Sequence, residues 1–320
     1  MKRLAKPEGV GNIVVEEVEV PRIGPDQVLI RAERTLISRG SEIWRRYNRP
    51  EAIPHSSMGY SLAGRVVEVG DRVAGFSPGD RVAASAPHAE YVAVEIGARP
   101  GPSVVLLPDT LSMEAATFWP LSTSSVLWVD ETGAGPGDTM AILGQGLVGS
   151  GCMQVAKAGP GARVIAVDAL PLRCQLARSL GADEVVDAQA EDPVEAVRRL
   201  SGGGAQIVVE AVGGRAGARA FAQAQDMVAR GGLLQVLGLY EDEPLPLDSS
   251  KIQGRRLIGG YLDPQRRTDG SRRALELLAS GRIRMDEMVT HRFVFAEGKA
   301  AFDLLYENLQ ETMAVILVWD

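Results

Sequence analysis

The chain has 320 residues, of which 45% are hydrophobic and 23% are charged. This length is typical of about two domains, and the composition is that of an ordinary globular protein, which excludes a disordered chain and a fibrous repeat. The 34 basic and 41 acidic residues give a net charge of −7, which argues against nucleic acid as a partner because such binding needs a concentrated positive face.

Short alternating segments separated by turns fill the first third of the chain. Alternation of apolar and polar residues is typical of strands with one buried face. Strands are predicted at residues 13–20, 27–32, 64–69, 81–84 and 91–94. Many short strands with regular turns predict a small β-barrel. A helix with Ser112 as its N-cap is predicted next, over residues 112–128.

From about residue 130 onward, strands alternate with helices, which predicts a doubly wound parallel sheet in an α/β fold. The predicted strands are 139–143, 163–167, 184–186, 207–210 and 233–237. After residue 265 this alternation is lost, and helices and strands are predicted at 272–278, 292–295, 298–305 and 314–319. The chain is therefore predicted to form a discontinuous domain of residues 1–125 and 264–320, with a second domain of residues 126–263 inserted into it.

The cellular compartment is inferred from the two cysteines, Cys152 and Cys174, and from the N-terminus. Two cysteines are too few for a disulfide scaffold or a four-thiolate zinc site, and packing is their simplest role. The first residues lack the apolar core of a signal peptide, and no apolar run reaches the length of about 18 residues that crosses a bilayer. We therefore expect a cytoplasmic protein with no membrane partner.

The segment from Gly144 to Gly149 has the pattern Gly-x-Gly-x-x-Gly and lies between a predicted strand and a predicted helix. In this context the pattern predicts a dinucleotide site. Gly144 permits a tight turn, Gly146 lets the backbone approach a pyrophosphate, and Gly149 lets the helix pack closely on the strand. The helix that begins with Leu147 and Val148 offers its N–H groups to the phosphates. The alternative is a glycine-rich turn that binds no ligand.

The strand after this motif ends in Asp168, about 20 residues further on, as a dinucleotide site requires. A carboxylate at this position accepts hydrogen bonds from the adenosine ribose and repels a 2′-phosphate, which favours NAD over NADP. Arg173 follows five residues later and could offset this repulsion. The sequence therefore predicts NAD as the cofactor, with NADP as the less favoured alternative.

Four segments resemble the medium-chain dehydrogenase/reductase superfamily, the relatives of alcohol dehydrogenases and quinone reductases. They are residues 59–70 (GYSLAGRVVEVG), 76–82 (FSPGDRV), 144–149 (GQGLVG) and 177–183 (ARSLGAD). The resemblance covers nearly the whole chain. It implies a chaperonin-10-like β-barrel catalytic domain, a Rossmann cofactor domain and an active site in the cleft between them.

The chain departs from the zinc-dependent members of this superfamily at the positions of the metal ligands. Ser38 stands in place of the first ligand cysteine, in a stretch one residue longer, and Tyr60 stands in place of the ligand histidine. Residues 117–123, where a later ligand is expected, contain no Cys or His, and residues 96–108 lack the four-cysteine lobe. The histidines are too scattered to form a replacement triad: His55, His88 and His291. We therefore predict no zinc.

Without zinc, another group must stabilise or protonate the substrate oxygen. Tyr60 is the first candidate, because a phenol with an ordinary pKa of about 10 is protonated near neutral pH and can donate to a developing alkoxide. Ser38 or Ser41 could relay the proton to solvent. The alternative is that Tyr60 only lines the pocket. For Glu42, at an acidic position of the family, a structural salt bridge is as good an interpretation.

Further cofactor contacts are expected from residues outside the glycine-rich motif. Turns after later strands place Gly213 in one position and Gly238, Leu239 and Tyr240 in another, and ligands of such sheets lie outside the carboxyl ends of the strands. The resemblance implies that Arg39 binds the pyrophosphate and that the nicotinamide ring is contacted by Ser122 or Thr123. The alternative for Arg39 is a solvated barrel arginine.

The leading hypothesis is a zinc-independent, NAD-dependent oxidoreductase that transfers a hydride between nicotinamide and an alcohol or carbonyl substrate, which could be polar or polyhydroxylated. One alternative is an NAD(P)H-dependent enoyl or quinone reductase, and another is a non-catalytic NAD(H)-binding protein. His55 and His88 are either proton shuttles or structural polar residues. The run 257–261 is predicted to be an edge strand that pairs two copies into a homodimer.

Overall fold

The computed structural model describes residues 1–239 and 244–319, which form two compact units. Unit 1 comprises Met1–Thr123 and Asp263–Asp320, and unit 2 comprises Ser124–Leu262. The borders predicted from the sequence lie after residues 125 and 263, and those of the units lie after residues 123 and 262. In the described part of the chain, no helix has the length and apolar character needed to cross a membrane.

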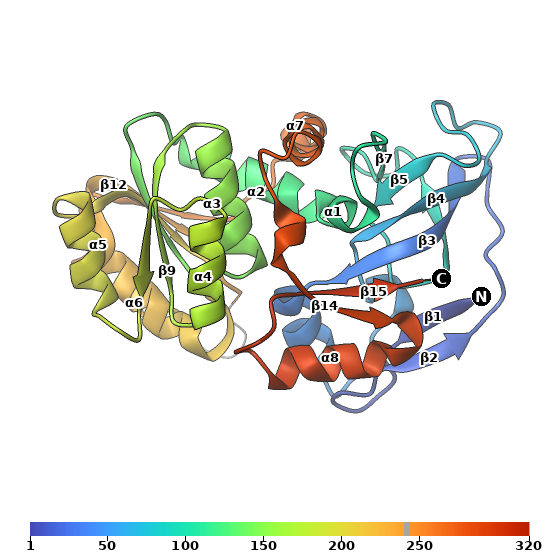
Figure 1. Cartoon of the computed structure of the whole chain (residues 1–320), viewed down its shortest axis with the longest axis horizontal. Helices are drawn as coiled ribbons and strands as arrows, with labels where there is room; N and C mark the ends of the chain where they lie inside the picture. Colours follow the sequence, from blue (N-terminus) through green and yellow to red (C-terminus); the bar gives the residue numbers. More distant parts are fainter. Residues whose placement is uncertain (240–243, 320) are drawn as a thin grey trace. The chain divides into compact units, whose positions relative to one another are not determined.

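Unit 2 is built on a six-stranded parallel sheet, which confirms the predicted fold class (Figure 1). Its strands are β8 (Thr139–Leu143), β9 (Arg163–Asp168), β10 (Glu184–Asp187), β11 (Ala205–Glu210), β12 (Val228–Val236) and β13 (Arg256–Gly259). Their order is β10-β9-β8-β11-β12-β13, so the first strand of the unit lies in the interior of the sheet and the chain reverses direction beside it. Ligands of doubly wound sheets bind at this reversal.

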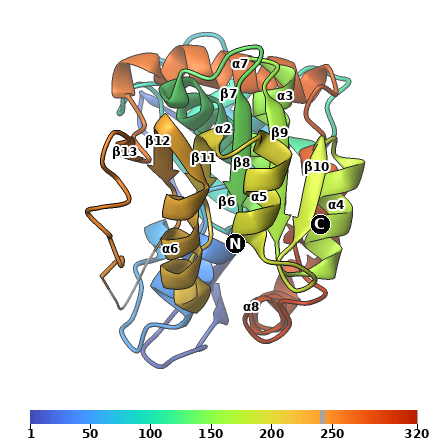
Figure 2. The same cartoon turned by 90° about the vertical axis from the view of Figure 1, so that its left-hand side faces the viewer.

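Helices cover both faces of this sheet (Figure 2). Helices α3 (Leu147–Ala158) and α4 (Pro171–Ser179) lie on one face, and α5 (Pro193–Ser201) and α6 (Gly217–Met227) lie on the other. The start of α5 shows why these segments are helical: Asp192 accepts hydrogen bonds from the first turn, and Pro193 needs no intrahelical donor there. The middle residues of β8, β9 and β11 are apolar and buried because both faces of the sheet are covered.

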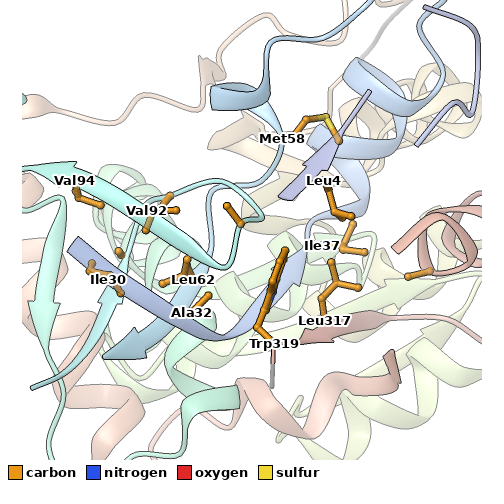
Figure 3. Packing of buried hydrophobic residues seen from close by; sticks show 14 of the residues in the cluster. Leu4, Ile30, Ala32, Ile37, Met58, Leu62, Val92, Val94, Leu317 and Trp319 are labelled. Carbon is orange, nitrogen blue, oxygen red and sulfur yellow. The ribbon is translucent and has the colours of Figure 1, made fainter. Parts of the chain in front are cut away.

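Unit 1 contains a mixed sheet whose central strand is β3 (Gln27–Ile37). β3 pairs antiparallel with β4 (Leu62–Val69) along one edge, and with β6 (Tyr91–Glu95) and then β15 (Ala314–Val318) along the other. The other strands are β1 (Lys2–Ala5), β2 (Val14–Glu17), β5 (Arg81–Ala84), β7 (Val104–Leu106) and β14 (Val289–Val294). Pairing of one long strand with two different partners bends the sheet around a core (Figure 3).

This core is made of aliphatic side chains from distant parts of the chain. Figure 3 shows Leu4, Ile30 and Leu62 facing Val92 and Leu317, and all five are less than a tenth exposed. Burial of such side chains contributes roughly 1.5–3 kcal/mol each. The core therefore holds the N-terminal and C-terminal segments of the chain in one unit.

The helices of unit 1 differ from the prediction in two places. The helix predicted over residues 112–128 is interrupted, because Pro120 cannot donate a backbone hydrogen bond to the preceding turn. Ser112 nevertheless caps its first part, accepting from Ala115 N at 3.0 Å. The helices are α1 (Met113–Thr117), α2 (Trp119–Thr132), α7 (Arg267–Ala279) and α8 (Gly298–Glu307). Short 3₁₀ turns occur in unit 1 at His55–Ser57, Pro264–Arg266, Met285–Met288 and Phe295–Glu297, and in unit 2 at Gly214–Ala216.

A π-helix, η1 (Arg39–Tyr47), follows β3 and was not predicted. Its last turn carries the wide hydrogen bond of this helix type, from Asn48 N to Ile43 O at 2.9 Å. A π-helix accommodates one extra residue in a helical turn, which agrees with the extra residue in the stretch that begins at Ser38. Such turns are frequent at functional sites, so the residues of η1 are candidates for the functional site.

β13 forms one edge of the sheet in unit 2, as predicted for residues 257–261. Leu257 in this strand is 40% exposed, and Tyr261, two residues after β13 ends, is 60% exposed. Pairing of two copies through β13 stays a prediction.

Candidate active site

The glycine-rich motif forms the connection between β8 and α3. Gly144 has a φ of +86°, which glycine adopts without strain, and a Cβ there would lie 2.8 Å from Val212 Cγ2. A Cβ on Gly149 would lie 1.8 Å from the carbonyl oxygen of Gly144, so α3 can approach the loop this closely only with glycine at that position. The packing of the loop itself therefore explains these two glycines.

Gly146 differs from them, because the fold does not require glycine at this position. It is the N-cap of α3, with φ −74° and ψ −172°, an extended conformation open to any residue. The nearest atom that an added Cβ would meet is Nη1 of Arg173, 3.9 Å away. Room thus remains beside the first turn of α3, which begins with Leu147 and Val148, and a helix N-terminus favours an anion. This geometry fits the pyrophosphate of a dinucleotide.

Asp168 lies at the end of β9 and is buried. Its Oδ2 accepts from Gln145 N at 2.6 Å, and its Oδ1 accepts from Leu170 N at 2.9 Å. Arg173 Nη1 lies 3.8 Å from Oδ2, and Arg173 Nε is buried with no hydrogen-bond partner among the residues described. Asp168 therefore braces the phosphate loop, a role that sequence analysis did not predict, while its remaining lone pairs can still accept from a ribose hydroxyl.

Two turns at the carboxyl ends of β11 and β12 hold each other in place beside the glycine-rich motif. A Cβ on Gly213 would lie 3.2 Å from the carbonyl oxygen of Leu239. Glu210, the last residue of β11, accepts from Gly238 N through its carbonyl oxygen at 3.0 Å. The structure therefore brings three of the predicted cofactor residues to one edge of the sheet. Tyr240 lies outside the described residues.

In unit 1, the predicted catalytic residues Tyr60, Ser38 and Ser41 lie together. Burial raises the pKa of the Tyr60 phenol above its ordinary value of 10.0, and the nearby hydroxyls of Ser38 and Ser41 oppose this rise. Ser41 Oγ makes no well-formed hydrogen bond to any described residue, so it lies near the phenol without being aligned to it. Glu42 further raises the pKa of the phenol, and Arg46 lowers it.

Glu42 is fully buried in η1 and makes several polar contacts. Its Oε1 accepts from Ser38 N at 2.9 Å, and its Oε2 lies 2.9 Å from His88 Nε2 and 3.5 Å from Arg46 Nη1. The ion pair between Glu42 and Arg46 agrees with one interpretation from the sequence, that Glu42 forms a structural salt bridge. Its partner His88 was not singled out in that role, because 46 residues separate the two and no local pattern connects them.

Three further residues that were predicted to contact the cofactor lie in unit 1. Arg39 Nε donates to Leu305 O at 3.0 Å, and its guanidinium lies 5.7 Å from the ring of Trp44, so part of its hydrogen-bonding capacity is used within unit 1. Thr123 Oγ1 donates to Trp119 O at 2.9 Å, within α2. Ser122 is fully buried, and its Oγ has no partner among the described residues. Cofactor binding by these residues stays a prediction.

The residues at the expected metal position do not fit a zinc ion. Tetrahedral zinc in proteins takes about three ligands from Cys, His, Asp or Glu, whereas Ser38 and Tyr60 offer hydroxyl groups. Within residues 1–239 and 244–319, no cluster of three or more such ligands occurs. Cys152 and Cys174 are both buried, and burial raises the pKa of the Cys152 thiol to about 12, far from the thiolate form that binds metals.

Comparisons with known proteins cover both units. One family model, described as the alcohol dehydrogenase GroES-like domain, matches residues 24–98, and another, described as zinc-binding dehydrogenase, matches residues 148–279. The first of these agrees with the predicted chaperonin-10-like catalytic domain. The second is described as zinc-binding, whereas the sequence predicts no zinc for this chain.

Individual relatives match along nearly the whole chain. L-threonine 3-dehydrogenase from Bacillus licheniformis is 28% identical, over 95% of this chain and 95% of that protein. Sorbitol dehydrogenase from Bacillus subtilis is 26% identical, over 95% of this chain and 94% of that protein. The solved structure of the alcohol dehydrogenase TADH from Thermus sp. ATN1 is 27% identical, covers 99% of both chains and has a TM-score of 0.84. With these similarities and its two observed units, the chain belongs to the medium-chain dehydrogenase/reductase superfamily, as an alcohol dehydrogenase-type oxidoreductase of a family that binds NAD(P).

Proposed function

We propose that this chain is a zinc-independent, NAD-dependent oxidoreductase that reduces a carbonyl group to an alcohol, or catalyses the reverse reaction. The observation that carries the proposal is the grouping of the Tyr60 phenol with Ser38 and Ser41. The resemblance implies that two of these residues, Tyr60 and Ser38, stand in place of metal ligands of zinc-dependent relatives. Hydroxyl groups can donate a hydrogen bond or a proton to a substrate oxygen and so stabilise its negative charge. Zinc stabilises the same charge as a Lewis acid.

Several residues of unit 2 would hold the cofactor. The amides of Leu147 and Val148, with Gly146 leaving room beside them, suit the pyrophosphate. Asp168 suits the adenosine ribose, and the turn that contains Gly213 suits the nicotinamide half of the cofactor. When bound, the cofactor supplies or accepts a hydride at the nicotinamide ring.

The protonation state of Tyr60 favours reduction over oxidation. Because burial raises the pKa of its phenol, this group stays protonated throughout the neutral range and can donate to a carbonyl oxygen as that oxygen gains charge. Alcohol oxidation needs the opposite, a phenolate at neutral pH. The charge of Arg46 lowers the pKa of this phenol, and the charge of Glu42 raises it.

The substrate class is proposed from the chemistry of unit 1 and from the relatives. The hydroxyls of Ser38, Ser41 and Tyr60 suit a polar substrate that carries hydroxyl groups. Relatives named for threonine and sorbitol agree with this class. We therefore propose a polar or polyhydroxylated carbonyl or alcohol compound.

A second candidate is an enoyl or quinone reductase that uses NAD(P)H. It is favoured by the position of Arg173, whose guanidinium lies 3.8 Å from the Asp168 carboxylate and beside Gly146. A cation at this place partly cancels the charge that would repel a 2′-phosphate. NADPH, which enoyl and quinone reductases commonly prefer, is therefore disfavoured less strongly than Asp168 alone implies.

A screen of ketones, aldehydes, enones and quinones with both reduced cofactors tests these candidates. We expect NADH oxidation with polar carbonyl compounds, insensitive to chelators, and a fall in kcat of about 10²–10⁴-fold in Tyr60→Phe. Tyr91→Phe, the same change on β6, is the control and retains activity.

Several outcomes would contradict the proposal. Full activity in Tyr60→Phe, or a stoichiometric tightly bound transition metal, would exclude the proposed proton donor. Faster NADPH oxidation with enones or quinones would favour the second candidate. Tight NADH binding without turnover of any compound would indicate a non-catalytic protein.

A further inference from the structure

His88 is fully buried in unit 1, and both nitrogens of its ring have polar partners. Nδ1 lies 2.9 Å from Thr35 Oγ1, and Nε2 lies 2.9 Å from Glu42 Oε2. Thr35 Oγ1 has a second partner, the indole Nε1 of Trp319, at 2.9 Å. All four side chains are 5% exposed or less, so water does not compete for these hydrogen bonds.

The chemistry of the four groups gives this row of hydrogen bonds a direction. An indole N–H can only donate, so Thr35 Oγ1 accepts from Trp319. A hydroxyl has one proton and two lone pairs, so the Thr35 hydroxyl can still donate its proton to its other partner, His88 Nδ1, when that nitrogen is unprotonated. A neutral imidazole with a free Nδ1 carries its proton on Nε2 and donates it to Glu42. The row therefore ends on the Glu42 carboxylate, and the guanidinium of Arg46, 3.5 Å away, stabilises the negative charge there.

His88 also contacts both chain segments that carry the hydroxyl groups of the candidate site. Through Glu42, whose Oε1 accepts from Ser38 N, it holds the start of η1. Its own backbone N–H donates to Met58 O at 2.6 Å, two residues before Tyr60. A Cβ on Gly59 would lie 2.8 Å from the His88 ring, so the segment before Tyr60 packs directly on the imidazole.

We propose that His88 is a positioning residue, held as the Nε2–H tautomer by Trp319 and Thr35, which fixes Glu42 and the Met58–Tyr60 segment and so sets the Tyr60 phenol against Ser38. This role rests on the proposed function only where it concerns the reaction. No proton transfer by His88 to substrate is involved. The groups that face the phenol are Ser38, Ser41, Glu42 and Arg46.

The tautomer can be tested in the protein without any substrate. In the ¹⁵N spectrum of the imidazole rings, with the His88 signals assigned by their loss in His88→Gln, we expect an unprotonated Nδ1 and a protonated Nε2 at neutral pH. Trp319→Phe leaves Thr35 Oγ1 free to accept from His88 Nδ1, and Thr35→Val removes the donor to Nδ1, so both variants should weaken the preference for this tautomer. A wild-type ring protonated on Nδ1, or on both nitrogens, would overturn the proposal.

The positioning role can be tested by the signal of the Tyr60 phenol carbon in protein labelled with ¹³C-tyrosine. We expect this signal to shift in His88→Leu, to return toward its wild-type position in His88→Gln, which can still donate to Glu42, and to stay unchanged in the control His291→Leu. An unshifted Tyr60 signal in a folded His88→Leu variant would overturn the proposal. If His88→Leu does not fold, a Tyr60 signal displaced equally by His88→Gln and Thr35→Val would support it, and an unmoved signal in both would overturn it.

Kinetics connect this role to the reaction. Misplacement of a reacting group by about 1 Å can cost about 10²-fold in rate, so we expect kcat for carbonyl reduction to fall by about 10- to 100-fold in His88→Leu, with KM for NADH unchanged and most of kcat restored in His88→Gln. Equal loss in both variants would contradict positioning through Glu42. If the wild type reduces no carbonyl compound, the proposed function fails, while the two spectra still decide the role of His88.

Discussion

Two glycines of the glycine-rich motif allow a test of the proposed cofactor site, because Gly146 has open space beside it whereas Gly149 packs against the backbone. An added Cβ at Gly146 meets its nearest neighbour, Arg173 Nη1, at an ordinary contact distance of 3.9 Å. An added Cβ at Gly149 comes within 1.8 Å of the Gly144 carbonyl oxygen, which belongs to the backbone and cannot move away cheaply. Alanine at the first position should therefore impair ligand binding, and alanine at the second should impair folding.

The magnitudes follow from these distances. In Gly146→Ala a methyl group fills the room proposed for the pyrophosphate, and loss of one charge-assisted hydrogen bond of about 1.5–3 kcal/mol raises the Kd for NADH by about 10- to 100-fold. Its stability should change by no more than about 1 kcal/mol, the scale of an N-cap substitution. In Gly149→Ala an overpacking cost of about 3 kcal/mol exceeds the helix-propensity gain of about 1 kcal/mol, for a net loss of about 2 kcal/mol.

Fluorescence titration with NADH gives the Kd, and urea denaturation gives the free energy of unfolding. Gly259→Ala is the matched control, since an added Cβ on this residue of β13 meets no atom within 4 Å. Unaltered NADH affinity in Gly146→Ala would refute the placement of the pyrophosphate. A Gly149→Ala variant as stable as the wild type would refute the assignment of that glycine to loop packing.

Three other predictions concern charged groups. Lys6→Met leaves three backbone carbonyls without their ammonium donor, so urea denaturation should show a loss of about 3 kcal/mol, and an unchanged midpoint would contradict this. Asp168→Asn should weaken NAD binding about tenfold and narrow the preference for NAD over NADP in calorimetric titrations, because a neutral amide does not repel a 2′-phosphate; an unaltered preference would count against this residue as the selector. Arg292 lowers the pKa of Glu114 below its ordinary 4.5 mainly through hydrogen bonds, so the stability this pair contributes is present above that pH and is lost as pH falls through the folded-state pKa. Arg292→Gln should therefore cost about 0.5–1 kcal/mol at neutral pH and nothing in strong acid, and a pH-independent loss would show that the carboxylate is not involved.

Much of the fold could be predicted because its signals are local. The strands and helices of unit 2 follow from apolar runs, caps and turns within short windows, and the dinucleotide site at Gly144 was predicted from a motif together with its place between a strand and a helix. Asp168 is an intermediate case. Its place after β9 was evident from the sequence, but its hydrogen bond to Gln145 depends on how the loop curls back over the strand end.

Departures from the prediction occur where distant segments meet. β3 continues to Ile37, beyond the predicted end at residue 32, because β15 pairs with its second half. The extra residue after Ser38 was visible in the sequence, but its absorption by a π-helix depends on the contacts of η1.

The sequence by itself determined which chemical groups are available: a glycine-rich loop, a carboxylate after the following strand, and hydroxyls at the positions that the resemblance matches to metal ligands. Only the tertiary structure decided how the hydroxyls are held, because Trp319, Thr35, His88 and Glu42 are joined across separations of 46 to 284 residues. Secondary-structure patterns depend on neighbours along the chain, whereas a buried hydrogen-bond network depends on side chains that meet only after the sheet has closed around its core.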